Sequence, residues 1–200
     1  MPQMNVAKTV LLASALSAMG LCASASPESD ALVAATELRQ SGDWQGARTT
    51  ATGVGRDIIE WQYLRAGKGS FDECTAFLER NSDWPGLPLL ARKCEASISD
   101  AVNPRDVVAF FDTYPPQTGA GTVALTRAYQ LTGADGDAQA QAVIAWQTLV
   151  LDAESESHLL THFPTQIVPH NPDRARMLMW QGKFDDAARL VPYLPEGWAE

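Results

Sequence analysis

Residues 81–90 read Asn-Ser-Asp-Trp-Pro-Gly-Leu-Pro-Leu-Leu, a segment that ends one helix and starts another. Proline lacks a backbone N–H and its ring clashes with the preceding helical turn, so no helix continues through Pro85 and Pro88. Pro88 nevertheless suits the first turn of a new helix. We therefore predict that two helices meet here at a fixed angle. The predicted structural hinge comprises Trp84, Pro85, Gly86 and Pro88.

Two cysteines, Cys74 and Cys94, lie at equal distances on either side of Trp84. In an antiparallel helix pair that turns near residue 84, they would lie opposite each other. Both belong to apolar stripes at helical spacing, so both are expected to face inward. The stripes are Phe71, Cys74, Phe77, Leu78 and Leu87, Leu90, Cys94, Ile98. A disulfide and two buried free thiols both stay open, because the sequence does not give the backbone separation.

Helix signals dominate the rest of the chain and strand signals are weak. A capping box is expected at Ser70 and Glu73, and capping asparagines at Asn103 and Asn171, each before a proline. Left-handed C-terminal caps are expected at Gly42, Gly67, Gly133 and Gly182. Helices are predicted over 28–41, 44–52, 56–66, 71–80, 87–99, 104–112, 121–132, 138–150, 153–163, 172–180 and 183–191.

A degenerate repeat links three of these helix starts, at 42–47, 69–74 and 182–187. Each copy has glycine first, an aromatic residue third and a small residue sixth. The glycine would end one helix, the aromatic residue would anchor the next, and the small residue would let the two helices approach closely. Stacked hairpins bury surface that a single hairpin leaves exposed. The predicted fold class is all-α, a right-handed α-superhelix built as a solenoid of irregular helical hairpins.

The N-terminus has the features of a secretory signal peptide over residues 1–25. Lys8 precedes an apolar run that is too short to span a bilayer, and Ala23 and Ala25 form a small-x-small cleavage pattern. Lipidation at Cys22 is the less favoured alternative, because Leu21 stands where a small residue is wanted. No other segment is apolar enough to cross a membrane. The expected location is the periplasm.

Composition narrows the class of partner. The chain has 15 basic and 24 acidic side chains, a formal net charge of −9. This charge argues against a nucleic acid partner, because binding to phosphates needs a basic surface. It also means that any contact with an acidic polymer would depend on shape and local hydrogen bonds.

An ordered set of residues around the hinge, spanning roughly 130 positions, resembles one family, the soluble lytic murein transglycosylases. In this family an α-helical superhelix carries a lysozyme-like catalytic domain. Besides 81–90, the matching residues are Trp61, Tyr63, Ala66, Gly69, Ser70, Phe71, Glu73, Phe77, Leu78, Phe110, Phe111, Pro116, Thr118, Gly119, Gly121, Ala145, Trp146, Trp180, Gly182, Ala187 and Arg189.

The family's catalytic signatures are not found in this sequence. The resemblance places catalysis in a downstream lysozyme-like domain with a Glu-Ser pair and a Gly-Leu-Met-Gln stretch. Glu154-Ser155 and Glu156-Ser157 look similar, but no aromatic residue follows at the family's spacing, and both pairs are expected to be solvated on a polar helix face. Residues 26–200 are accordingly expected to form the N-terminal part of a superhelical domain that continues past Glu200.

Three other patterns have both a functional and a structural explanation. His158 and His162 have metal-ligand spacing but lack the glutamate of the zincin pattern, so surface polar residues are the favoured interpretation. Residues 118–122, Thr-Gly-Ala-Gly-Thr, open a helix that could face an anion, yet they lack a phosphate loop's lysine. The tryptophans Trp44, Trp61, Trp84, Trp146 and Trp180 are expected to be wedges between helices rather than sugar platforms.

The sequence therefore predicts a scaffold portion of a peptidoglycan lytic transglycosylase. By resemblance, the complete enzyme would be a carbohydrate lyase that cleaves β-1,4 bonds between N-acetylmuramic acid and N-acetylglucosamine to 1,6-anhydro products. Its partners would be glycan strands and the lysozyme-like domain. No catalytic, cofactor-binding or metal residue is assigned, and this chain alone is expected to be inactive. The alternative is a free-standing periplasmic helical-repeat module that binds a protein partner.

Overall fold

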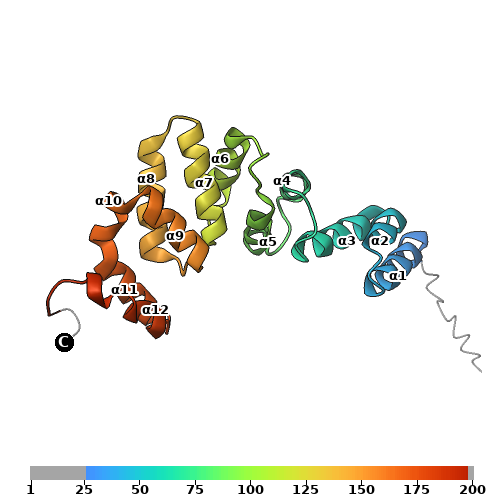
Figure 1. Cartoon of the computed structure of the whole chain (residues 1–200). Coiled ribbons are helices and arrows are strands. Elements are labelled where there is room, and N and C mark those ends of the chain that lie inside the picture. Colours follow the sequence, from blue (N-terminus) through green and yellow to red (C-terminus); the bar gives the residue numbers. More distant parts are fainter. Residues whose placement is uncertain (1–25, 198–200) are drawn as a thin grey trace, which may run out of the picture.

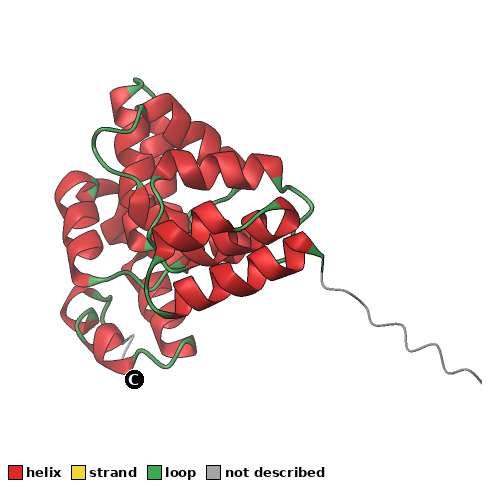
Figure 2. Ribbon diagram, turned by 90° about the vertical axis from the view of Figure 1, so that its right-hand side faces the viewer, coloured by secondary structure: helices red, strands yellow, loops and turns green. Residues whose placement is uncertain are grey.

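A computed structural model of the chain describes residues 26–197, and all regular elements in this range are helices (Figure 1, Figure 2). The predicted all-α class is confirmed. The expected signal peptide, residues 1–25, lies outside the described residues, as do residues 198–200. The α-helices are α1 (Pro27–Gln40), α2 (Trp44–Thr50), α3 (Gly53–Arg65), α4 (Phe71–Arg80), α5 (Leu87–Cys94), α6 (Pro104–Thr113), α7 (Gly119–Leu131), α8 (Asp135–Thr148), α9 (Ala153–His162), α10 (Pro164–Ile167), α11 (Asn171–Trp180) and α12 (Phe184–Ala188). Short 3₁₀ helices are η1 (Glu95–Ser97), η2 (Val168–His170) and η3 (Val191–Tyr193).

Two predicted helices are shorter than expected. The α-helical part of 87–99 ends at Cys94, where the Ser97 hydroxyl donates to the Cys94 carbonyl at 2.7 Å and the chain tightens into η1. The helix predicted over 183–191 ends at Ala188, four residues before Pro192. In a continuing helix the ring of Pro192 would clash with the backbone carbonyl of Ala188. The short helix α10 was not predicted; it begins at Pro164, and Phe163 alone separates it from the end of α9.

Most predicted caps are present. Ser70 and Glu73 form the reciprocal capping box of α4, and the Asn103 side chain accepts from the Arg105 N–H at the start of α6. All four glycines expected at C-terminal caps have positive φ. Asn171 was wrongly predicted to be a cap, because it is already helical and its buried side chain accepts from Trp146 Nε1 at 3.1 Å.

The core is divided into four clusters along the chain rather than gathered at one centre. Figure 1 shows the helices following one another from α1 at one end to α12 at the other. The first cluster lies between α1, α2 and α3, the largest extends from α3 to α7, the third joins α8 to α10, and the last joins α11 to α12. Each helix packs mainly against its near neighbours in sequence, as in repeat proteins. No helix within residues 26–197 combines the length and apolarity needed to cross a bilayer.

Candidate functional site

The segment 81–90 forms the connection between α4 and α5. Asn81 caps α4 from a buried position, and its Nδ2 donates to the Phe77 carbonyl at 3.1 Å. The Trp84 N–H donates to the Asn81 carbonyl at 3.0 Å, which closes a turn. Gly86 then adopts φ 75° at the N-cap of α5, a left-handed conformation that glycine adopts readily, and Pro88 lies in the first turn.

Trp84 packs against aromatic rings of α3 and α4. Its ring meets the Phe77 ring edge-on with 5.5 Å between centroids, and the Trp61 ring of α3 at 6.4 Å. Trp84 stays half-buried against the largest core cluster. The hinge therefore brings α3 and α4 together around aromatic contacts.

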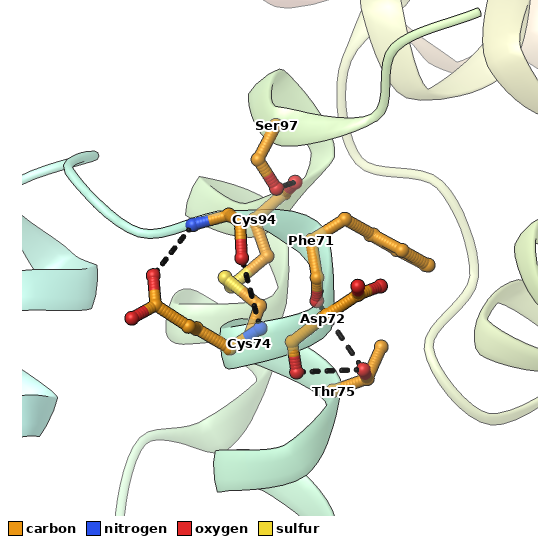
Figure 3. The surroundings of a disulfide bond; sticks show 8 residues. Phe71, Asp72, Cys74, Thr75, Cys94 and Ser97 are labelled. Carbon is orange, nitrogen blue, oxygen red and sulfur yellow. Dashed lines mark hydrogen bonds between the residues drawn. A yellow bond between two sulfur atoms is a disulfide. The ribbon is translucent and has the colours of Figure 1, made fainter. Parts of the chain in front are cut away.

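Cys74 and Cys94 form a disulfide that joins α4 to α5 (Figure 3). Their Cα atoms are 6.0 Å apart, and both side chains are buried. The sequence left free thiols as the alternative, and the structure contains the disulfide. The bond fixes the hairpin beyond its turn.

The loop before α7 contacts the buried Glu95 of η1. Glu95 is only 2% exposed, and its carboxylate accepts from the Gln117 N–H at 2.8 Å and from the Thr118 hydroxyl. Any Cβ at Gly121 would overlap this carboxylate. Burial raises the pKa of the Glu95 carboxyl, while the hydrogen bonds from Thr118 and Gln117 act in the opposite direction. The Glu95 carboxyl group thus occupies the space beside residues 118–122 in which the sequence suggested an anion.

The other glycine of this loop has a second close neighbour. A Cβ at Gly119 would overlap the hydroxyl of Ser155, at the start of α9. Asp152 caps that helix by accepting from the Ser155 N–H at 2.8 Å, and this hydrogen bond is the main cause of the lowered pKa of Asp152. The Gly-Ala-Gly stretch therefore lets α7 pack closely against η1 on one side and α9 on the other.

A cavity of about 330 Å³ opens beside this contact, lined by α6, α7, α9 and the loop after η1. Its walls include Val107 and Val123, and the polar groups around it include an ion pair between Arg127 and Asp100. His158 also lines it, with a buried Nε2 that has no hydrogen-bond partner. The volume suits a small ligand.

The His158 ring packs against a second histidine of α9. It stacks on the His162 ring with 4.1 Å between centroids, and His162 Nδ1 lies 2.8 Å from the His158 carbonyl oxygen. Burial lowers the pKa of His158, and the nearby His162 and Arg127 lower it further. Among residues 26–197, no group of three or more His, Cys, Asp or Glu side chains could hold a metal ion.

A polar network joins α9 to α8 and α11. The sequence indicated solvated side chains at this part of α9. Glu156 was expected to be solvated, but its carboxylate pairs with the buried Arg174 guanidinium at 2.8 Å. That guanidinium also donates to the Trp146 carbonyl at 3.1 Å and lies over the Trp146 ring, 4.1 Å from its centroid. Ser155 is likewise buried rather than solvated. Ser155 and Glu156 thus have structural partners for which local spacing gave no signal, whereas Glu154 and Ser157 are exposed as expected.

The tryptophans do not all behave as predicted. Trp146 is fully buried as a wedge, and Trp44, Trp61 and Trp84 are half-buried. Trp180, which was also predicted to be a wedge, is 86% exposed at the end of α11.

Comparison of this chain with known protein families, curated proteins and solved structures finds no match.

Proposed function

We propose that this chain is the N-terminal helical scaffold of a peptidoglycan lytic transglycosylase and that it works in the periplasm. The observation that carries the proposal is the α4–α5 hairpin, in which the Trp-Pro-Gly hinge is joined by the Cys74–Cys94 disulfide. This hairpin lies in the part of the sequence with the densest resemblance to that family. Disulfides persist in oxidising compartments, which supports an exported protein.

The finer architecture belongs to the same proposal. The successive hairpins, with one core cluster after another, support a right-handed α-superhelix. In this proposal the superhelix positions a lysozyme-like domain and guides glycan strands. Many of the resembling residues are buried, including Phe71, Phe77, Phe110, Phe111 and Trp146. Packing explains these residues, so catalysis would belong to the lysozyme-like domain.

The test is enzymatic digestion of purified peptidoglycan. The secreted chain, residues 26–200, is expected to release no 1,6-anhydro-muropeptides, whereas a product of the same gene that includes the lysozyme-like domain is expected to release them. Activity of residues 26–200 alone would overturn the assignment of this chain as a scaffold.

The alternative is a free-standing periplasmic module that binds a protein partner. It is favoured by the exposure of two large aromatic side chains, Trp180 and Phe184, on the last hairpin, because exposed apolar surface often marks an interaction site. The reading frame beyond codon 200 separates the two proposals. A following segment with Glu-Ser and Gly-Leu-Met-Gln supports the scaffold, and a stop codon supports the module.

A further inference from the structure

A groove of about 390 Å³ runs between α4 and α6, away from the cavity beside α7. Both walls show helical periodicity, so each helix presents one continuous stripe to it. The stripe on α4 and the turn after it contains Phe71, Asp72, Thr75, Leu78, Glu79 and Ser82. The stripe on α6 and its end contains Asp106, Ala109, Phe110, Thr113 and Tyr114.

The floor of the groove is apolar and partly aromatic. Phe71 from α4 and Phe110 from α6 meet edge-on with 5.3 Å between ring centroids. Leu78 and the half-buried Tyr114 also line the groove. The volume leaves room for one or two large apolar side chains from a ligand.

The rim of the groove carries negative charge. Asp72 and Glu79 line it from α4 and Asp106 lines it from α6, and all three are exposed. Among the described residues that line the groove, none is Lys or Arg. The nearby Arg80 pairs instead with Glu60 of α3 at 2.8 Å. The charge of the rim is therefore not neutralised from within its lining.

We propose that this groove binds a basic amphipathic helix of a partner protein. Apolar side chains of that helix would contact the exposed Ala109 and the half-buried Tyr114. Its Lys or Arg side chains would face Asp72, Glu79 and Asp106. Two helices that present matched stripes form the kind of groove that accepts a third helix. Each wall has a helix of ten residues, about 15 Å long, which accommodates roughly three turns of a ligand helix.

The wall formed by α4 is held in place before any partner arrives. Phe71, Asp72 and Thr75 lie on the turns of α4 that contain Cys74, and Figure 3 shows them beside the disulfide. The capping box at Ser70 fixes the start of the same helix. A preformed wall lowers the ordering cost of binding. A second copy of this chain is a poor occupant, because its net charge of −9 would repel the acidic rim.

The test measures binding of a fluorescent Leu/Lys amphipathic peptide of about 15 residues to the secreted chain. At about 0.15 M salt, where charges are screened beyond about 8 Å, we expect saturable one-to-one binding. The double variant Asp72→Lys/Asp106→Lys should weaken binding by at least about tenfold. The control Asp135→Lys/Asp137→Lys removes two first-turn acids of α8 and makes the same charge change away from the groove, so it should weaken binding by less than about twofold.

A second pair of variants covers the case in which charge reversal destabilises the fold. Ala109→Arg fills the groove from an exposed helical position, and Ala140→Arg makes the same change on the exposed face of α8. Loss of binding in the first and retention in the second supports the proposal. Equal weakening by groove and control variants would overturn it, because binding would then follow net charge alone. Occupation of the groove by a second copy, seen as concentration-dependent dimerisation that Ala109→Arg abolishes, would also overturn it.

Discussion

Two hairpins of this protein share a local motif but differ in what they bury. The α3–α4 connection contains Gly69, Phe71 and Cys74, and the α11–α12 connection contains the equivalent Gly182, Phe184 and Ala187. The small residue is buried in both hairpins. The aromatic residue is not, because Phe71 is 4% exposed whereas Phe184 is 67% exposed.

The difference comes from the neighbouring helices. Phe71 lies in the largest cluster, where Phe110 of α6 packs against it from beyond the hairpin. The cluster around α11 and α12 consists of four buried residues and does not include Phe184. The motif therefore specifies close approach of two helices through the small residue. Burial of the aromatic residue depends on a partner that the motif does not encode.

The largest loss of unfolding free energy is expected at Phe71, which packs against Phe110. Phe71→Ala removes a buried ring from a packed cluster, which costs about 3–5 kcal/mol of unfolding free energy. Urea denaturation followed by circular dichroism measures this loss. A loss below about 1 kcal/mol would show that the α4–α6 contact is not a packed core and would break the contrast with α12.

The second effect concerns the disulfide that joins α4 to α5. The α11–α12 hairpin, residues 171–188, contains no cysteine. The double variant Cys74→Ala/Cys94→Ala should lower the unfolding free energy by about 3 kcal/mol, because the bond closes a loop with a sequence separation of 20. The unfolding free energy of the reduced wild-type chain should match that of the double variant, apart from the packing contribution of the two sulfur atoms that the variant lacks. Thiol labelling in denaturant provides the check, since two reactive thiols without reductant would rule out the bond.

Sequence reasoning succeeded where structure is set locally. The capping box at Ser70, the asparagine cap at Asn103 and the positive-φ glycines each depend on a few neighbouring residues. The predicted bounds of α4 and α6 agree with the structure to within one residue. The all-α class needed no more than this. The finer superhelical arrangement depends on how hairpins pack together, so it stays a prediction.

The sequence could not indicate partners that are far apart along the chain. Asn171 has the local pattern of a cap, yet Trp146, 25 residues away, takes its side-chain oxygen. Glu156 has the pattern of a surface charge until Arg174 packs beneath it. The Gly-Ala-Gly loop suggested an anion site, but nothing local identified Glu95 as the group that occupies this space. In each case tertiary packing overrode a correct local preference.

The third effect is a pH dependence of the unfolding free energy, caused by Glu95. Glu95 follows α5 and ties the α4–α5 hairpin to α7 through Gln117 and Thr118. Because burial raises its pKa, the unfolded chain ionises first as the pH rises, and wild-type stability falls relative to Glu95→Gln. Lowered pKa values at Glu73 and Asp152 act in the opposite direction but are common to both proteins.

Unfolding free energies of wild type and Glu95→Gln, measured at pH 4 and pH 7, isolate this residue. The unfolding free energy of Glu95→Gln, relative to that of wild type, should be higher at pH 7 than at pH 4. A move in favour of wild type would mean that the hydrogen bonds at the start of α7 outweigh burial and hold the pKa of Glu95 below its ordinary value.

The smallest effect is expected at the exposed aromatic residue of the last hairpin. Phe184→Ala should change the unfolding free energy by no more than about 0.5 kcal/mol, because most of the ring already contacts solvent. Ala187→Leu is the matched test of the shared motif: it should destabilise by about 1–3 kcal/mol, since the larger side chain separates α11 from α12. If Phe184→Ala were as costly as Phe71→Ala, the ring would have a packing partner in solution. The difference in exposure between Phe71 and Phe184 would then come from a packing contact of Phe184 that the structure does not contain. The interpretation that the small residue alone determines how closely the two helices approach would no longer be needed.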